Sequence, residues 1–214
     1  MKKTGFTLAE VLITLMILGV IAAMTVPTLI QDTQKKEQVV QMKKGLSMVN
    51  QAITMNYALE QENLGDLAEV GDVIDLMKKR LSVVDSGTAW ATTSDGLTYV
   101  WSANLEPADT CTGSDINNED GTCATYELVI ATAPINGQAV KDASNKDVTI
   151  TRDNLTFEMA KQLVPTSTST NVLTGFYNFY AGEDRVIPSF ATQAIMNAKD
   201  LKKLKASDLA KSST

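Results

Sequence analysis

The chain has 214 residues and a net charge of −6, with 44% hydrophobic and 21% charged residues, values that are ordinary for a globular protein and exclude overall disorder. An acidic balance argues against binding nucleic acid through phosphate contacts. The sequence has no histidine, which excludes Ser-His and Cys-His nucleophile systems. We therefore expect neither an enzyme nor a bound cofactor.

The first thirty residues are the most distinctive part of the chain. From Phe6 to Ile30 the sequence is almost purely apolar, and Glu10 is its only charged residue. A membrane-spanning helix needs about 20 apolar residues, so this segment is long enough to cross a bilayer. A carboxylate inside such a segment is costly, which makes Glu10 a candidate functional residue.

The residues K-K-T-G-F-T-L-A-E-V-L-I-T-L resemble the leader and N-terminal helix of type IV pilins and of the pilin-like subunits of type II secretion and DNA-uptake systems. The resemblance implies that a prepilin peptidase cuts after Gly5 and N-methylates Phe6. It also assigns an assembly role to Glu10. Gly19 and Pro27 fall where the helix of this family usually carries a glycine and a proline.

Three other interpretations of the same segment stand beside this one. A secretory signal peptide has a shorter apolar core, although Ala22 and Ala23 would suit its cleavage site. A plain signal anchor needs neither the glycine-aromatic junction nor the acid. A lipoprotein leader needs a cysteine after the apolar region, and the first cysteine is Cys111. Ala9 departs mildly from the family, which more often has Ile or Val there.

The resemblance covers about the first 55 residues, and together with the residue patterns of the remainder it gives an organisation and a location for the whole chain. Residues 1–5 are a cleaved leader, 6–30 a transmembrane and assembly helix, 31–62 its amphipathic continuation, and 63–214 a globular α+β domain. Its implied partners are other pilin-like subunits, prepilin peptidase and the inner-membrane assembly platform. The chain is then a single-pass bacterial inner-membrane protein with a periplasmic domain, which later joins a filament or the cell surface.

Two roles for Glu10 remain open. The carboxylate can lie near enough to the membrane surface to reach lipid headgroups. Alternatively, it can pair with the N-terminal amine of a neighbouring subunit, a partner that an isolated subunit would lack. The hydroxyls of Thr7, Thr14 and Thr25 can be satisfied on the preceding helical turn.

Beyond Ile30 the sequence becomes polar, and apolar residues recur in steps of three and four. These steps predict one face of an amphipathic helix that continues to about Glu62. We expect Pro27 to bend or locally melt the helix and Gly45 to weaken it slightly. The apolar face consists of Val39, Met42, Leu46, Val49, Ile53 and Tyr57.

The sequence after the long helix predicts a small antiparallel sheet and hence an α+β fold, in which the long N-terminal helix packs on that sheet. Trp90 and Trp101 flank an Asp-Gly turn and are expected in the same sheet. The tail from Ala191 is predicted as a weak helix or a frayed end. The expected elements are a helix at 70–84, strands at 97–101, 126–130, 176–180 and 185–190, the last at an edge, a hairpin of 147–151 with 155–159, and an exposed loop at 165–171.

Two cysteines enclose a polar, acidic loop. In an exported protein, Cys111 and Cys123 are expected to form a disulfide, with two unpaired thiols as the alternative. Oxygen-bearing side chains at alternate positions give a weak calcium candidate. A solvated acidic loop is the competing interpretation. The calcium candidates are Asp115, Asn117, Glu119 and Asp120, with Asp109 nearby.

The sequence as a whole favours a pilin-like subunit that is processed and assembled into a type IV pilus, a type II secretion pseudopilus or a DNA-uptake filament. One rival is a minor tip subunit that binds DNA or a surface ligand. The other is a membrane-anchored exported domain that does not assemble.

Overall fold

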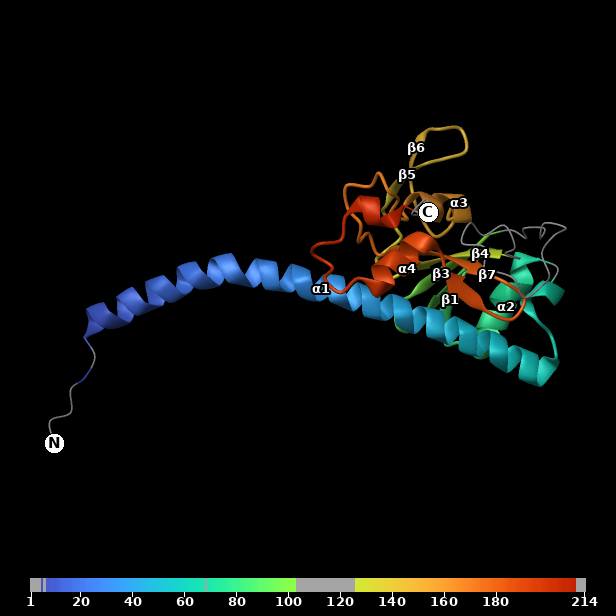
Figure 1. Ribbon diagram of the computed structural model, residues 1–214, viewed down its shortest axis with the longest axis horizontal. Helices are drawn as coiled ribbons and strands as arrows, with labels where there is room; N and C mark the ends of the chain where they lie inside the picture. Colours follow the sequence, from blue (N-terminus) through green and yellow to red (C-terminus); the bar gives the residue numbers. More distant parts are fainter. Residues whose placement is uncertain (1–4, 6, 68, 103–125, 211–214) are drawn as a thin grey trace. The chain divides into compact units, whose positions relative to one another are not determined.

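The computed structural model describes residues 5, 7–67, 69–102 and 126–210 (Figure 1). The chain divides into two compact units, one up to Glu37 and the other from Gln38 onward. The helices are α1 (Leu8–Glu60), α2 (Val70–Arg80), α3 (Phe157–Gln162) and α4 (Phe190–Asn197), with short 3-10 turns η1 (Leu64–Asp66) and η2 (Ala206–Leu209). The strands are β1 (Val83–Ser86), β2 (Trp90–Thr93), β3 (Thr98–Trp101), β4 (Tyr126–Ala131), β5 (Ala139–Lys141), β6 (Asp147–Thr149), β7 (Phe176–Ala181) and β8 (Val186–Pro188).

The second unit is built on a six-stranded antiparallel sheet in the order β1-β2-β3-β4-β7-β8. The three central strands are almost completely buried, and Leu128 of β4 lies opposite Trp101 of β3 and Phe179 of β7. Gly96 takes a positive φ of 85° in the turn that joins β2 to β3, as the Asp-Gly pair predicted. The α+β prediction, with the helix packed on an antiparallel sheet, is confirmed.

Helices cover both faces of this sheet. Figure 1 shows α2 and the second half of α1 on one side, and α3 with the small β5–β6 sheet on the other. Trp101 belongs to the core on the α1 side and Trp90 to the core on the α3 side. Both tryptophans are thus buried in the same sheet, as expected, but they face opposite layers. Trp101 packs edge-on against Tyr126, with ring centroids 6.2 Å apart.

The second half of α1 buries four residues of the predicted apolar stripe, while Leu46 is partly buried and Tyr57 at its end is not buried. Val39, Met42, Val49 and Ile53 are at most 7% exposed. Tyr57 is 55% exposed instead, so this part of the prediction is wrong. The buried residue at this end of the helix is Asn56.

Asn56 can be buried because its amide is fully used. Its Nδ2 donates to the Glu62 carbonyl at 3.2 Å, and its Oδ1 accepts from Nη2 of Arg80, also at 3.2 Å. A buried polar side chain is tolerated when it is hydrogen-bonded in this way. The Asn56 amide therefore joins the end of α1 to the end of α2.

Two further contacts fix α1 to the sheet. The Asn50 amide pairs with the edge strand β8, donating to the Val186 carbonyl at 3.1 Å and accepting from the Val186 N–H at 2.7 Å. At Gly45 the helix comes so close to the sheet that an added Cβ would lie 3.2 Å from side-chain atoms of both Leu97 and Ile130. Gly45 therefore permits close packing, a role beyond the slight weakening predicted for it.

An ion pair joins the same helix to the β2–β3 turn. Lys44 Nζ lies 2.8 Å from Asp95 Oδ2. Burial by itself raises the pKa of the Asp95 carboxyl, but hydrogen bonds with Lys44 and Thr93 outweigh it, so the net pKa is below its ordinary value. Folding therefore favours the ionised form of the Asp95 carboxyl relative to an ordinary aspartate.

Two predicted elements differ from the structure. The helix expected over 70–84 ends at Arg80, because the β-branched residues that follow form β1 against β2. The hairpin of 147–151 with 155–159 is wrong: β6 pairs with β5, and Thr156 begins helix α3 by accepting the Met159 N–H in its side chain.

The other elements follow the predictions. The strands at 97–101, 126–130 and 176–180 correspond to β3, β4 and β7, and β8 is an edge strand containing Pro188. The loop at 165–171 is largely exposed. In the tail, α4 and the turn η2 pack through Ile195 and Leu209 against the α1 side of the core, so this segment is more ordered than a frayed end.

Candidate processing and assembly segment

The first half of α1 is an apolar helix that nothing in its own unit covers. Every described residue from Leu8 to Gln31 is exposed, and Leu8 and Met16 are 81% and 74% exposed. Within the part of the chain that the structure describes, α1 is the one helix long and apolar enough to cross a membrane. Apolar residues surround the helix on all sides, the composition that a lipid or protein environment requires.

The start of α1 is fixed by a reciprocal pair of hydrogen bonds between Thr7 and Glu10. The Glu10 N–H donates to Thr7 Oγ1 at 3.3 Å, and the Thr7 N–H donates to Glu10 Oε2 at 3.2 Å. The Thr7 hydroxyl also donates to Glu10 Oε2, at 3.3 Å. This arrangement is a capping box, which satisfies N–H groups that have no partner inside the helix.

The capping box changes the interpretation of both residues. The Thr7 hydroxyl bonds forward to Glu10 rather than to a preceding turn, so the sequence-based expectation for Thr7 is wrong. Thr14 and Thr25 do bond back, to the carbonyls of Val11 and Ile21. The carboxylate of Glu10 has a hydrogen-bonding partner within its own chain, whereas the sequence analysis considered lipid headgroups and the amine of a neighbouring subunit. The pattern T-L-A-E at 7–10 is itself a capping-box signature and could have shown this.

Gly19 and Pro27 both lie inside α1. A Cβ added at Gly19 would meet no atom within 4 Å, so this glycine serves no packing contact in its own unit. The helix continues through Pro27 without interruption, so the residue does not melt it. Pro27 removes one backbone hydrogen bond, and α1 remains helical on both sides of it.

The remaining predicted site residues are only partly described. Gly5 is exposed and precedes the helix. Phe6 lies outside the described residues, as do Cys111, Cys123 and the calcium candidates Asp115, Asn117, Glu119 and Asp120. The disulfide and the calcium site therefore remain predictions.

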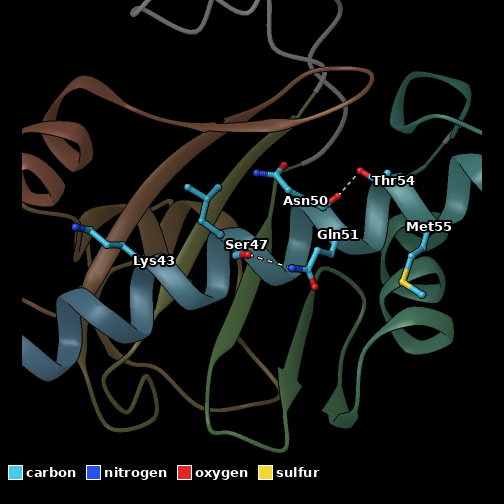
Figure 2. Close-up of a pocket in the computed structure, with 7 residues that line it drawn as sticks. Lys43, Ser47, Asn50, Gln51, Thr54 and Met55 are labelled. Carbon is cyan, nitrogen blue, oxygen red and sulfur yellow. Dashed lines mark hydrogen bonds between the residues drawn. The ribbon is translucent and has the colours of Figure 1, made fainter.

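The second half of α1 carries an open groove of about 510 Å³ along its flank. Figure 2 shows its lining side chains arrayed along the helix, with Gln51 Nε2 donating to Ser47 Oγ at 3.3 Å and Thr54 Oγ1 donating to the Asn50 carbonyl at 2.9 Å. These polar groups are satisfied within the helix, and Met55 adds an exposed apolar side chain. The lining residues are Lys43, Leu46, Ser47, Asn50, Gln51, Thr54 and Met55.

Comparison with known proteins supports the assignment of the N-terminal segment. Residues 1–26 match a family model described as the prokaryotic N-terminal methylation motif. No curated protein and no solved structure gave a match. The match covers Gly5, Phe6, Glu10 and Gly19, and the apolar first half of α1 fits anchoring in the inner membrane. The first 26 residues are therefore a prepilin-type segment like those of type IV pilins and pseudopilins, and they make the chain a pilin-like substrate of prepilin peptidase.

Proposed function

We propose that this protein is a structural pilin-like subunit, assembled into a type IV pilus or a type II secretion-like filament after processing between Gly5 and Phe6. The observation that carries the proposal is the uncovered apolar half of α1, joined to a methylation motif and carrying one carboxylate in its first turn. A segment apolar on all sides needs either lipid or other such helices around it. Assembly would move this segment from the lipid bilayer to a position among the apolar helices of other subunits.

In this proposal, the Thr7–Glu10 capping box sets the position of the carboxylate. The two Thr7 donors hold Oε2 of Glu10 at the beginning of the helix, close in sequence to the methylated amine that cleavage would create at Phe6. One oxygen is occupied by Thr7, and a carboxylate has further acceptor positions for a charged amine. The amine of a neighbouring subunit can use them, which would fix the axial register between helices.

The second unit would form the filament surface in the periplasm and beyond. Its half of α1 is fixed to the sheet through Asn50 and the Lys44–Asp95 pair, and to α2 through Asn56. The groove from Lys43 to Met55 leaves one flank of the helix open to a neighbouring subunit. We assign the chain no enzymatic role, since it has no histidine and its filament role needs only packing.

The capping box allows the two roles of Glu10 to be separated by mutation. Glu10→Val removes both charge and cap. Glu10→Gln removes the charge but keeps a side chain that suits the third position of a capping box. Thr7→Ala removes the cap but keeps the charge. Incorporation into filaments is measured by cross-linking in membranes, with Glu10→Asp as an additional charged variant.

If charge pairing drives assembly, Glu10→Gln and Glu10→Val should both lose most filament incorporation, whereas Thr7→Ala should retain most of it. Glu10→Gln and Glu10→Val should insert at least as well as wild type, because removing a carboxylate from an apolar segment lowers the cost of insertion. Thr7→Ala and Glu10→Asp keep the carboxylate and should insert as wild type does. The pairing mechanism fails if Glu10→Gln assembles normally. The structural-subunit proposal itself fails if wild-type chains form no cross-linked filament.

A further inference from the structure

A cavity on the α3 side of the second unit has no part in the proposed assembly. Its volume is about 350 Å³, and it lies between the loop after α3, strand β7 and the start of α4. This size is at the lower end of the range for small-ligand sites. Its lining includes Val164, Pro165, Ser167, Asn178, Tyr180 and Phe190.

Asn178 of β7 gives this cavity its chemistry. The residue is 7% exposed, and its side-chain Oδ1 has no hydrogen-bond partner among the described residues. Its backbone carbonyl is well satisfied, accepting from Ser189 N–H at 3.1 Å and from Thr192 Oγ1 at 2.8 Å. The backbone is therefore fixed while the amide oxygen is left without a partner among the described residues. A buried unpaired acceptor is costly, and the cost is relieved when a bound molecule supplies a donor.

The other unpaired buried oxygens in the described chain differ from this one. Asp85 and Glu127 each contact a cation at 2.7 Å, from Arg152 and Lys161 respectively. The hydroxyls of Tyr99 and Tyr177 belong to fully buried rings in the core on the α1 side. Asn178 combines an unpaired amide oxygen with a place in the wall of a cavity. The terminal torsion of an asparagine is broad, so a small rotation can turn either amide atom toward a ligand.

The remaining lining indicates a neutral ligand with one apolar face. Lys161 is the cationic residue in the lining, and its Nζ is already paired with Glu127. Val164, Pro165 and Phe190 provide apolar and aromatic surface, and Ser167 and Ser189 provide hydroxyls. A sugar ring presents carbon-bound hydrogens on its faces and hydroxyls around its edge, which matches this division. We propose that the cavity binds a neutral monosaccharide unit, with the Asn178 amide as its principal hydrogen-bonding partner.

The test uses the full-length chain in phosphatidylcholine nanodiscs, because a glycoside detergent would itself be a ligand. Free glucose, galactose and N-acetylglucosamine are the probes, with glucuronate as a charged comparison, and binding is followed by saturation-transfer NMR and titration. Ser167→Trp places a large side chain at the exposed rim of the cavity. Thr170→Trp is the matched control, since Thr170 is exposed in the same loop and is not part of the lining.

At least one neutral sugar should bind wild type saturably and more tightly than glucuronate. Ser167→Trp and Asn178→Leu should each weaken that binding about tenfold, the scale of one lost contact with a buried group. Thr170→Trp should bind as wild type does. Asn178→Leu should keep its melting temperature, because it removes an unpaired polar atom. The proposal is overturned if no neutral sugar binds, or if Ser167→Trp binds as tightly as wild type.

Discussion

The two halves of α1 form one continuous helix, but their side chains differ in composition. From Leu8 to Gln31 every residue is exposed, and apolar side chains point in all directions. From Gln38 onward one face is buried against the sheet, and the other is mostly polar with a few exposed apolar side chains, namely Val40, Met55, Tyr57 and Leu59. Helical hydrogen bonding is the same in both, so the difference lies in what each half needs around it. The first half needs an apolar environment supplied from outside, and the second finds its cover within its own domain.

Blocking the processing step should have the largest effect on the first half. Gly5→Val places a branched side chain next to the scissile bond, so we expect almost complete loss of cleavage and methylation. Mass spectrometry of the membrane form should then find chains beginning at Met1, where wild type begins at N-methylated Phe6. Gly19→Val, which meets no neighbour within its unit, should be processed normally. Recovery of wild-type chains cut near Ala23 would contradict the assignment.

The close approach of the second half to the sheet can be tested with glycine substitutions. Gly45→Leu forces a side chain toward Leu97 and Ile130, and overpacking of this kind costs about 1–3 kcal/mol of unfolding free energy. Gly71→Leu is the control, since a Cβ at Gly71 in α2 meets nothing within 4 Å and a better helix former gains up to about 1 kcal/mol. Denaturant unfolding of both variants decides the matter. If Gly45→Leu were as stable as Gly71→Leu, the helix could move away from the sheet at no cost in free energy.

The amphipathic stripe could be predicted because packing in a helix repeats with a regular period. Val39, Met42, Val49 and Ile53 are buried as this period requires. The burial of Asn56 in place of Tyr57 could not be predicted, because it depends on Arg80 of α2 and on the path of the chain just after α1, at Glu62.

Short strands were the other weak point of the sequence interpretation. Strands β5 and β6 have three residues each, and their pairing depends on a partner that no local pattern specifies. The capping signals at Thr7 and Thr156 were local and readable, and they mark the starts of α1 and α3.

The Asn50 amide tests whether α1 stabilises the sheet edge by hydrogen bonds as well as by apolar packing. Asn50→Leu leaves both the N–H and the C=O of Val186 without their partner, and we expect a loss of about 1–3 kcal/mol in unfolding free energy. Gln51→Leu is the neighbouring control, because Gln51 is exposed and, within the described part of the chain, its side chain bonds only to Ser47 on the same helix. That change should stay within about 0.5 kcal/mol. An equal effect of the two substitutions would mean that packing alone holds β8.

The smallest expected effect concerns the Lys44–Asp95 pair, and its pH dependence identifies it. Because the pKa of Asp95 is lower in the folded chain than its ordinary value of 3.8, the ionised carboxylate stabilises the fold above about pH 4. This contribution disappears as the pH falls through the folded-state pKa and the carboxylate takes up a proton. Lys44 is 57% exposed, so solvent screening limits the pair to less than about 1 kcal/mol. Lys44→Met should therefore lower the unfolding free energy slightly at pH 7 and leave it unchanged at acid pH. Lys43→Met, on the same exposed flank, should show no such difference between the two conditions. If Lys44→Met costs as much stability in acid as at neutral pH, the lysine acts through the packing of its aliphatic chain, and its charge has no part in joining α1 to the sheet.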